Sequence, residues 1–381
     1  MHPQLRPGDA AIIFAEMRRI FVLSFCLLAA SALAVEWRVL HEHDNDYVSF
    51  ANVAQFYQFP NYTRVNGGVA LKSDQRGIRA QSGRSELFIN GVRFFTSFPI
   101  LNNGGDNLIS ATDVIKIIEP VLRPSRITGA QPVETVVLDP GHGGVDQGAA
   151  NSWGSEKAFT LDVALRARDV LRRAGFKVEM TRSSDISVSL DDRVNFANRF
   201  TRAVFISIHF NSSNGGTGLE SYALAPDGTP SNASSENHPT ANDMAWYPGN
   251  SRDSANIALT AAVHASVLRQ LRTNDRGIRH ARFHVLRGMN VPALLLEGGF
   301  LSDPAEAQRI ATSQFRQQLG EAIAQGVKIY NTAVNYRGNA PTFETARLQL
   351  PPHSQSIAEP LRPDIPPAAT NAAATIAIPG Q

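Results

Sequence analysis

Three short runs of β-branched and aliphatic residues stand out along the chain, and each leads to a polar side chain. The runs cover 136–138, 203–208 and 293–296, and the side chains that follow them are His142, His209 and Glu297. Continuous apolar runs of this length are typical of strands buried on both faces. The Asp-Pro-Gly sequence before His142 then predicts a tight turn, with the histidine held between glycines.

Amphipathic segments separate these strands. Apolar residues recur at helical spacing over 159–174, 191–200, 254–271 and 315–330, and 176–181 has the pattern of a further strand. Strands that alternate with helices predict an α/β architecture. The expected fold is a twisted, mostly parallel sheet flanked by helices, preceded by a small α+β domain.

Four side chains that bind metals or move protons are expected at one edge of this sheet. Active sites of open α/β sheets lie beyond the carboxyl ends of the strands, where His142, His209 and Glu297 occur, and Glu156 begins the first helix. Two imidazoles and one carboxylate leave a position of tetrahedral zinc open, as in catalytic sites, and the second carboxylate can act as a general base. From the spacing alone, Glu156 is equally well explained as a favourable charge at a helix N-terminus.

Six motifs that occur in order carry a family resemblance. They are Leu-Asp-Pro-Gly-His-Gly-Gly at 138–144, Glu-Lys at 156–157, Thr-Arg-Ser-Ser-Asp at 181–185, Leu-Asp-Asp-Arg with Ala-Asn at 190–198, Ser-Ile-His-Phe-Asn at 207–211 and Leu-Glu-Gly-Gly-Phe-Leu-Ser-Asp at 296–303. With these motifs, residues 133–330 resemble the zinc-dependent N-acetylmuramoyl-L-alanine amidases of the AmiC type, the Amidase_3 family.

The resemblance implies a reaction and assigns roles to residues. His142, Glu156 and His209 match the zinc ligands of that family, and Glu297 matches its catalytic glutamate. The implied reaction is hydrolysis, by zinc-activated water, of the amide between N-acetylmuramic acid and L-alanine of the peptidoglycan stem peptide. We further predict that Asn211 binds substrate. A zinc-dependent peptidoglycan peptidase on a related fold stays open, as does a non-catalytic wall-binding relative, although no ligand and no catalytic glutamate is missing.

Other residues near the motifs receive structural interpretations. Asp139 could orient a ligand histidine, but it is explained best as a turn residue before proline. Arg182 and Arg193 are expected to form structural ion pairs. His280 and His284 lack a carboxylate motif that would complete a second metal site, and we predict that they lie at the surface or at the rim of the site.

The amino terminus predicts export. Residues 17–34 show a basic start, an apolar core and an Ala-Leu-Ala end, the order of a signal peptide, and 1–16 is then an upstream extension. The single cysteine, Cys26, lies inside this segment, so that nitrogen and oxygen atoms would hold zinc. No later stretch is apolar enough to span a bilayer. We expect a periplasmic or cell-envelope protein whose partner is peptidoglycan, and the sequence leaves open whether an activator protein is a second partner. A net charge of +2 is too mild for nucleic-acid binding.

The chain is expected to have four parts. Residues 1–34 are the extension and signal peptide, 35–127 an accessory α+β domain, 128–332 the zinc amidase domain and 333–381 a disordered tail rich in proline and alanine. The accessory domain loosely resembles the amino-terminal domain of copper amine oxidases, and we expect a wall-binding role. Within it, Asn90 followed by Gly91 predicts a hairpin. The polar insertion at 225–252 predicts a flexible loop on the substrate side.

Overall fold

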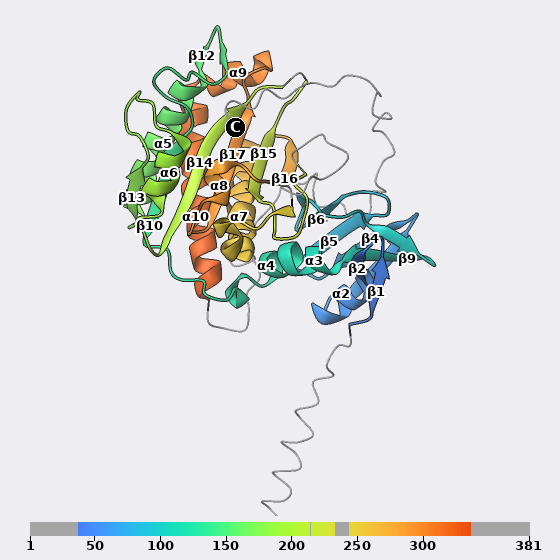
Figure 1. Cartoon of the computed structure of the whole chain (residues 1–381). Coiled ribbons are helices and arrows are strands. Elements are labelled where there is room, and N and C mark those ends of the chain that lie inside the picture. Colours follow the sequence, from blue (N-terminus) through green and yellow to red (C-terminus); the bar gives the residue numbers. More distant parts are fainter. Residues whose placement is uncertain (1–36, 214, 233–243, 337–381) are drawn as a thin grey trace, which may run out of the picture. The chain divides into compact units, whose positions relative to one another are not determined.

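The computed structural model describes residues 37–213, 215–232 and 244–336, and the helices and strands from Val39 onward belong to one unit (Figure 1). The predicted extension and signal peptide at 1–34 lie outside the described residues, as do residues 337–381 of the predicted tail. The last helix continues to Asn335.

Residues 39–126 form a region made mostly of antiparallel strands, here called the β-rich region. Its strands are β1 (Val39–Glu42), β2 (Asn45–Ser49), β3 (Asn61–Val65), β4 (Gly68–Lys72), β5 (Gly77–Gln81), β6 (Glu86–Ile89), β7 (Val92–Phe95), β8 (Leu101–Asn103) and β9 (Asp106–Ser110). Its helical segments are α2 (Phe50–Phe56), α3 (Ala111–Asp113), the π-helical η1 (Val114–Ile118), α4 (Glu119–Leu122) and the 3-10 segment η2 (Pro124–Arg126).

Local chemistry explains several boundaries in the β-rich region. The side chains of Ser49 and Ser110 accept hydrogen bonds from backbone N–H groups in the first turns of α2 and α3, as N-cap residues do. The predicted hairpin is present between β6 and β7, where Asn90 and Gly91 both adopt positive φ angles, 52° and 82°. A two-residue turn with both residues at positive φ matches the twist of the flanking strands.

The remaining strands form the α/β region, residues 133–335. They are β10 (Thr135–Pro140), β11 (Ala150–Asn151), β12 (Gly154–Ser155), β13 (Lys177–Met180), β14 (Ala203–Asn211), β15 (Leu219–Leu224), β16 (Asp275–Ala281) and β17 (Ala293–Phe300). The sheet order is β13-β10-β14-β17-β15-β16, and the first four strands are parallel. Strand β15 is antiparallel to β17 and parallel to β16. The predicted α/β fold with a mostly parallel sheet is confirmed.

The helices of this region agree with the amphipathic segments of the sequence. They are α5 (Glu156–Arg173), α6 (Leu190–Ala197), η4 (Pro248–Arg252), α7 (Asp253–Leu271), α8 (His284–Arg287), α9 (Pro304–Ile310) and α10 (Ser313–Asn335). The first of these helices begins at Glu156, as expected, and its apolar pattern covers 159–174. Within the insertion at 225–252, residues 233–243 lie outside the described ones, and η4 forms its end.

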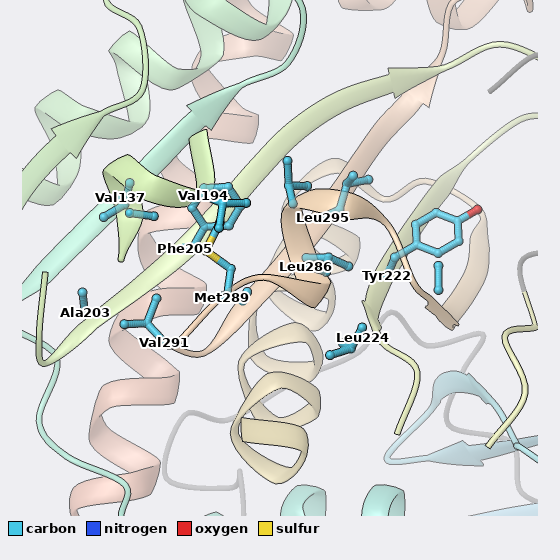
Figure 2. Close-up of a cluster of buried hydrophobic side chains, with 14 residues drawn as sticks. Val137, Val194, Ala203, Phe205, Tyr222, Leu224, Leu286, Met289, Val291 and Leu295 are labelled. Atoms are coloured by element: carbon cyan, nitrogen blue, oxygen red, sulfur yellow. The ribbon is translucent and has the colours of Figure 1, made fainter. Parts of the chain in front are cut away.

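Helices cover both faces of the sheet. Successive side chains of each strand point to opposite faces, so that the core has two parts, one on each face. Helix α10 packs on α5 and on α7, and α5 and α7 pack against the sheet. On the opposite face, α6 and α8 pack over a cluster that includes Val137, Phe205 and Leu295 from three neighbouring strands (Figure 2). These three residues occupy odd positions, as do His209 and Glu297 further along β14 and β17. The site therefore lies on the α6 and α8 face of the sheet.

The sheet of the α/β region continues into the β-rich region. Phe94 of β7 pairs with Ile278 of β16, so that one sheet runs from β13 to β3. An ion pair of 2.9 Å between Lys116 Nζ and Asp253 Oδ2 adds a second connection. The domain boundary near residue 127 stays a prediction.

Candidate metal centre

The four predicted side chains meet at the carboxyl end of the parallel strands. His142 follows β10, Glu156 is the first residue of α5, and His209 and Glu297 are register partners in the ladder of β14 and β17. One ligand atom each of His142, Glu156 and His209 lie within 4.8 Å of one another. Residues far apart in the sequence are thus brought to one point.

Glu156 lies between the two histidines. Its Oε1 is 3.0 Å from His142 Nε2 and 3.0 Å from His209 Nδ1, and the two rings are 5.0 Å apart in an edge-to-face arrangement. Backbone N–H groups hold the carboxylate in place, since Phe210 N donates to Oε1 at 3.1 Å and Ala149 N donates to Oε2 at 3.0 Å. Glu156 does occupy a helix N-terminus, but its carboxylate is engaged by the histidines. The helix dipole alone does not explain its position.

The electrostatics of this cluster favour a cation. Burial by itself would raise the pKa of Glu156, but the hydrogen bonds and charges of His142 and His209 hold the pKa of this carboxyl well below its usual value. Burial alone would lower the pKa of His142. The hydrogen bonds to Glu156 and Asp146 outweigh this effect of burial, so that the net result is a raised pKa. A buried, ionised carboxylate flanked by two imidazoles is a site that attracts positive charge.

The loop after β10 holds His142 in an unusual backbone conformation. Its φ angle is 59°, which is rare for a residue with a side chain. Asp146 Oδ2 lies 2.9 Å from His142 Nδ1, and Arg193 Nη2 donates to the carbonyl oxygen of His142 at 2.8 Å. A carboxylate on Nδ1 fixes the tautomer that leaves Nε2 free to bind a metal. We did not single out Asp146 from the sequence, although its position four residues after His142 was a usable signal.

The interpretation of Asp139 as a turn residue is wrong. Asp139 lies in β10 and is 1% exposed, and its carboxylate pairs with Arg193 at 2.6 Å. Thr181 Oγ1 and Ser207 Oγ also donate to it, at 2.6 Å and 2.8 Å. The predicted ion pair of Arg193 is therefore confirmed, and through Arg193 the buried carboxylate supports the backbone of His142.

Arg182 differs from its prediction. It is buried, but its guanidinium donates to backbone carbonyl oxygens, including those of Pro140 at 3.0 Å and Gly141 at 2.7 Å. The carbonyl groups at the end of β10 replace the expected acidic partner. Arg182 thus stabilises the chain reversal that leads to His142.

Two glycines allow the ligand side chains to approach the backbone. A Cβ atom on Gly141 would lie 2.2 Å from Cε1 of His209. A Cβ atom on Gly148 would lie 2.5 Å from Oε2 of Glu156 and 2.6 Å from Cδ2 of His142. The glycines of this segment are therefore needed for space as well as for turning.

Glu297 faces the cluster with an unused oxygen atom. Its Oε2 is buried and has no hydrogen-bond partner among the described residues. Burial raises the pKa of Glu297 well above its usual value, and the nearby carboxylates of Glu156 and Glu220 raise it further. A buried carboxyl oxygen without a partner costs stability unless it is used, so that this arrangement is typical of a functional group.

The other predicted residues lie in three different environments. Asn211 Nδ2 donates to Glu220 Oε2 at 3.2 Å, which places its amide between β14 and β15. His284 lies at the surface as predicted, with Nε2 2.6 Å from Asp191 Oδ1. The surface prediction for His280 is wrong, because this residue is 1% exposed and its ring is buried on the opposite face of the sheet from Arg279. Burial and the charge of Arg282 lower the pKa of His280 to about 4.

Comparisons with known proteins identify a family for this chain. A family model described as N-acetylmuramoyl-L-alanine amidase (Amidase_3) matches residues 136–329. The chain is 36% identical over 195 residues to the sporulation-specific N-acetylmuramoyl-L-alanine amidase of Bacillus subtilis, covering 51% of this chain and 66% of that protein. It is 34% identical over 217 residues to the amidase CwlM of Bacillus licheniformis, covering 55% and 76%, and 32% identical over 217 residues to the amidase AmiA of Escherichia coli, covering 51% and 75%.

Solved structures include further similar chains. The catalytic domain of the amidase CwlV from Paenibacillus polymyxa is 31% identical with a TM-score of 0.43, covering 52% of this chain and 98% of that one. The amidase AmiC2 of Nostoc punctiforme is also 31% identical with a TM-score of 0.43, covering 53% and 98%. The resemblance drawn from the sequence motifs is confirmed by the family match over more than half of the chain. The chain belongs to the N-acetylmuramoyl-L-alanine amidase family.

Proposed function

We propose that this chain is a zinc-dependent amidase that hydrolyses the bond between N-acetylmuramic acid and the L-alanine of peptidoglycan stem peptides. The observation that carries the proposal is the convergence of His142, Glu156 and His209, with the unpartnered Oε2 of Glu297 facing the same cluster. The family match supports the amidase reaction and the bond that is cleaved. The assignment of zinc and of the individual roles rests on the donor set of this chain.

The donor set fits zinc. Ligand atoms around tetrahedral zinc, at bonds of about 2.0–2.2 Å, lie roughly 3.3 Å apart. The Oε1 atom of Glu156 is 3.0 Å from a nitrogen of each histidine, so that small movements suffice to admit the ion. Nitrogen and carboxylate ligands suit zinc, and three protein ligands leave one coordination position for water or substrate.

Each residue has a defined task in the proposed reaction. When bound, zinc lowers the pKa of a water molecule and polarises the amide carbonyl. Asp146 keeps the proton of His142 on Nδ1, because its carboxylate is 2.9 Å from that atom. Glu297 takes the proton of the attacking water on Oε2 and returns it to the nitrogen of L-alanine as the bond breaks. A carboxyl whose pKa is raised by burial suits this transfer near neutral pH.

Location in the cell envelope is part of the proposal. The predicted signal peptide at 17–34 supports it, and so do similar proteins of Staphylococcus that are named probable cell wall amidase LytH. Among the described residues, no helix combines the length and the apolar character that crossing a membrane requires. We also propose that Asn211 helps to bind substrate, since it lies two residues beyond His209 on β14 and is partly exposed.

Mass spectrometry of digested peptidoglycan tests the reaction. We expect free stem peptides that begin at L-alanine, released by the wild-type chain and lost in Glu297→Gln, a change that keeps the shape of the side chain. Cleavage inside the peptide would instead support a peptidase, and binding without release would support a non-catalytic wall protein.

Metal analysis separates the ligands from the base. His142→Ala is expected to lose zinc, whereas Glu297→Gln is expected to retain one zinc ion per chain. Glu179→Gln, an exposed glutamate on β13, serves as the matched control and should change neither the metal content nor the release of peptides. Full activity in Glu297→Gln would contradict its role as the base.

A further inference from the structure

A row of side chains crosses the sheet from the metal cluster to the β-rich region. His209 of β14 is the register partner of Glu297 of β17, which in turn is the partner of Glu220 of β15. Arg279 of β16 is the partner of Tyr222, two residues after Glu220, so that it lies on the same face. Beyond β16 the sheet continues with β7 of the β-rich region. The row therefore links the proposed base to a separate part of the chain.

Glu220 is a buried charge that Arg279 neutralises. It is 3% exposed, and its Oε1 accepts a hydrogen bond from Arg279 Nε at 2.7 Å, with Arg276 Nε at 3.8 Å. Its Oε2 accepts from Asn211 Nδ2 at 3.2 Å. A buried carboxylate whose two oxygens are both engaged has a restricted position. Glu220 thus couples the end of β14 to the arginines of β16.

Arg279 is held from the other side by Phe95 of the β-rich region. Its guanidinium carbon lies 3.9 Å from the centre of the Phe95 ring, and the guanidinium of Arg93 lies 4.9 Å from the same ring. A cation over an aromatic face at this distance is attracted by the ring. Gly277 of β16 leaves room for the Phe95 ring. A Cβ atom on Gly277 would lie 2.9 Å from Cε2 of Phe95.

We propose that Glu220 and Arg279 position the Asn211 and Glu297 side of the active site, and that the β-rich region completes this arrangement by placing Phe95 on Arg279. The inference rests on the proposed amidase function for its effect on catalysis. Glu220 and Arg279 are positioning residues, because they act through Asn211 and Glu297 and do not reach the cluster of metal-binding side chains. The β-rich region is then a working part of the amidase in addition to any wall-binding role.

The geometry predicts how the arrangement fails. Without the ring of Phe95, Arg279 gains freedom on its exposed side and holds Glu220 less firmly. The carboxylate of Glu220 then moves away from Asn211 and from Glu297, its register partner. The contacts of His142, Glu156 and His209 stay unchanged. The backbone N–H of Arg93 still donates to Asp275 Oδ2 at 2.9 Å, and Lys116 still pairs with Asp253, so that the β-rich region stays attached.

The test uses the full chain with Phe95→Leu, which keeps an apolar side chain but removes the aromatic face. With a soluble peptidoglycan fragment as substrate, we expect kcat to fall about three- to tenfold, as the loss of one cation–π contact implies. We expect KM to stay within about twofold and the zinc content to stay at one per chain. Phe95→Tyr should restore kcat, because it restores the aromatic face.

A matched control lies in the same region. The guanidinium of Arg79 lies 5.2 Å from the ring centre of Phe88, which is half-buried like Phe95. Phe88 lies on β6, which does not pair with β16. Phe88→Leu should leave kcat and KM unchanged. Equal values of kcat for Phe95→Leu and Phe88→Leu, or a Phe95→Leu defect confined to KM, would overturn the proposal.

A double-mutant cycle separates this inference from the amidase assignment. Phe95→Leu and Glu220→Gln are combined, and unfolding by urea is measured in chelator without substrate. We expect the two changes to be coupled by at least about twofold in the unfolding equilibrium constant, since both act on Arg279. If the wild type releases no stem peptide, the amidase assignment fails. The cycle still decides whether Phe95 and Glu220 are coupled through Arg279. Additive effects of the two changes on the free energy of unfolding would overturn the proposal that Phe95 and Glu220 act together through Arg279.

Discussion

Replacing Gly141 with alanine is expected to remove zinc from the proposed site while leaving the fold in place. The added Cβ atom would lie 2.2 Å from Cε1, 2.5 Å from Nε2 and 2.6 Å from Nδ1 of His209. Carbon atoms in contact prefer a separation of about 3.5–4.0 Å, so the imidazole must shift by roughly 1.3 Å. Gly141 N donates to the carbonyl oxygen of Ile208 at 3.0 Å, and this bond prevents the backbone from moving instead.

The expected loss of affinity follows from that shift. Metal sites tolerate errors in ligand distance of only about 0.2 Å, so a displaced His209 ceases to be a ligand. Changing a partner of a ligand costs about 10- to 100-fold in metal affinity, and losing the ligand geometry should cost at least ~100-fold, or about 2.7 kcal/mol. Crowding of this kind destabilises a fold by about 1–3 kcal/mol, which the α/β region should survive.

Competition with a chelating dye measures the apparent zinc affinity, and thermal unfolding in chelator measures the fold. Gly77→Ala is the control, because a Cβ atom there meets nothing nearer than the carbonyl oxygen of Leu71 at 3.6 Å. A Gly141→Ala chain that binds zinc within about threefold of the wild type would refute the reasoning. It would mean that His209 does not bind the metal from the position seen here.

Three further predictions concern groups around the site and in the core. Asp146→Asn should weaken zinc binding about tenfold in the dye assay, because His142 loses the carboxylate that fixes its tautomer; unchanged affinity would argue against this role. Asp139→Asn should lower the free energy of unfolding in urea by about 3–5 kcal/mol, since Arg193 becomes a buried charge without a counterion. The pKa of His280 is lowered to about 4 from 6.5, so the unfolded chain takes up this proton before the native chain does. The stability that the neutral ring of His280 provides is therefore fully present above pH 6.5. It is lost as the pH falls toward 4, and the free energy of unfolding decreases by about 3 kcal/mol over this range. His280→Gln should remove this part of the pH dependence of unfolding, and an unchanged profile would show that other groups cause it.

The strands and helices around the site were predictable because their signals are local. The apolar runs before His142, His209 and Glu297 became β10, β14 and β17, and the amphipathic segments became α5, α6, α7 and α10. Each element buries a face that its own sequence pattern defines. The six ordered motifs identified the family for the same reason, because each is a short stretch within or next to a single element.

The misjudged residues are those whose environment depends on distant segments. Asp139 looked like a turn residue beside Pro140, but Arg193 and Ser207 from two other elements surround its carboxylate. His280 looked exposed in a polar stretch, yet it faces the buried side of β16. In both cases the neighbours that decide burial and charge come from far along the chain.

The sequence by itself determined the family, the order of the strands and helices, and the four residues that meet at the proposed metal centre. Tertiary structure alone decided which further side chains support them. Strand register placed Glu220 opposite Glu297, and the pairing of β16 with β7 brought Phe95 over Arg279. A local pattern specifies which face of a strand is buried, but it carries no record of which strand lies beside it. That choice is made when the distant segments pack together.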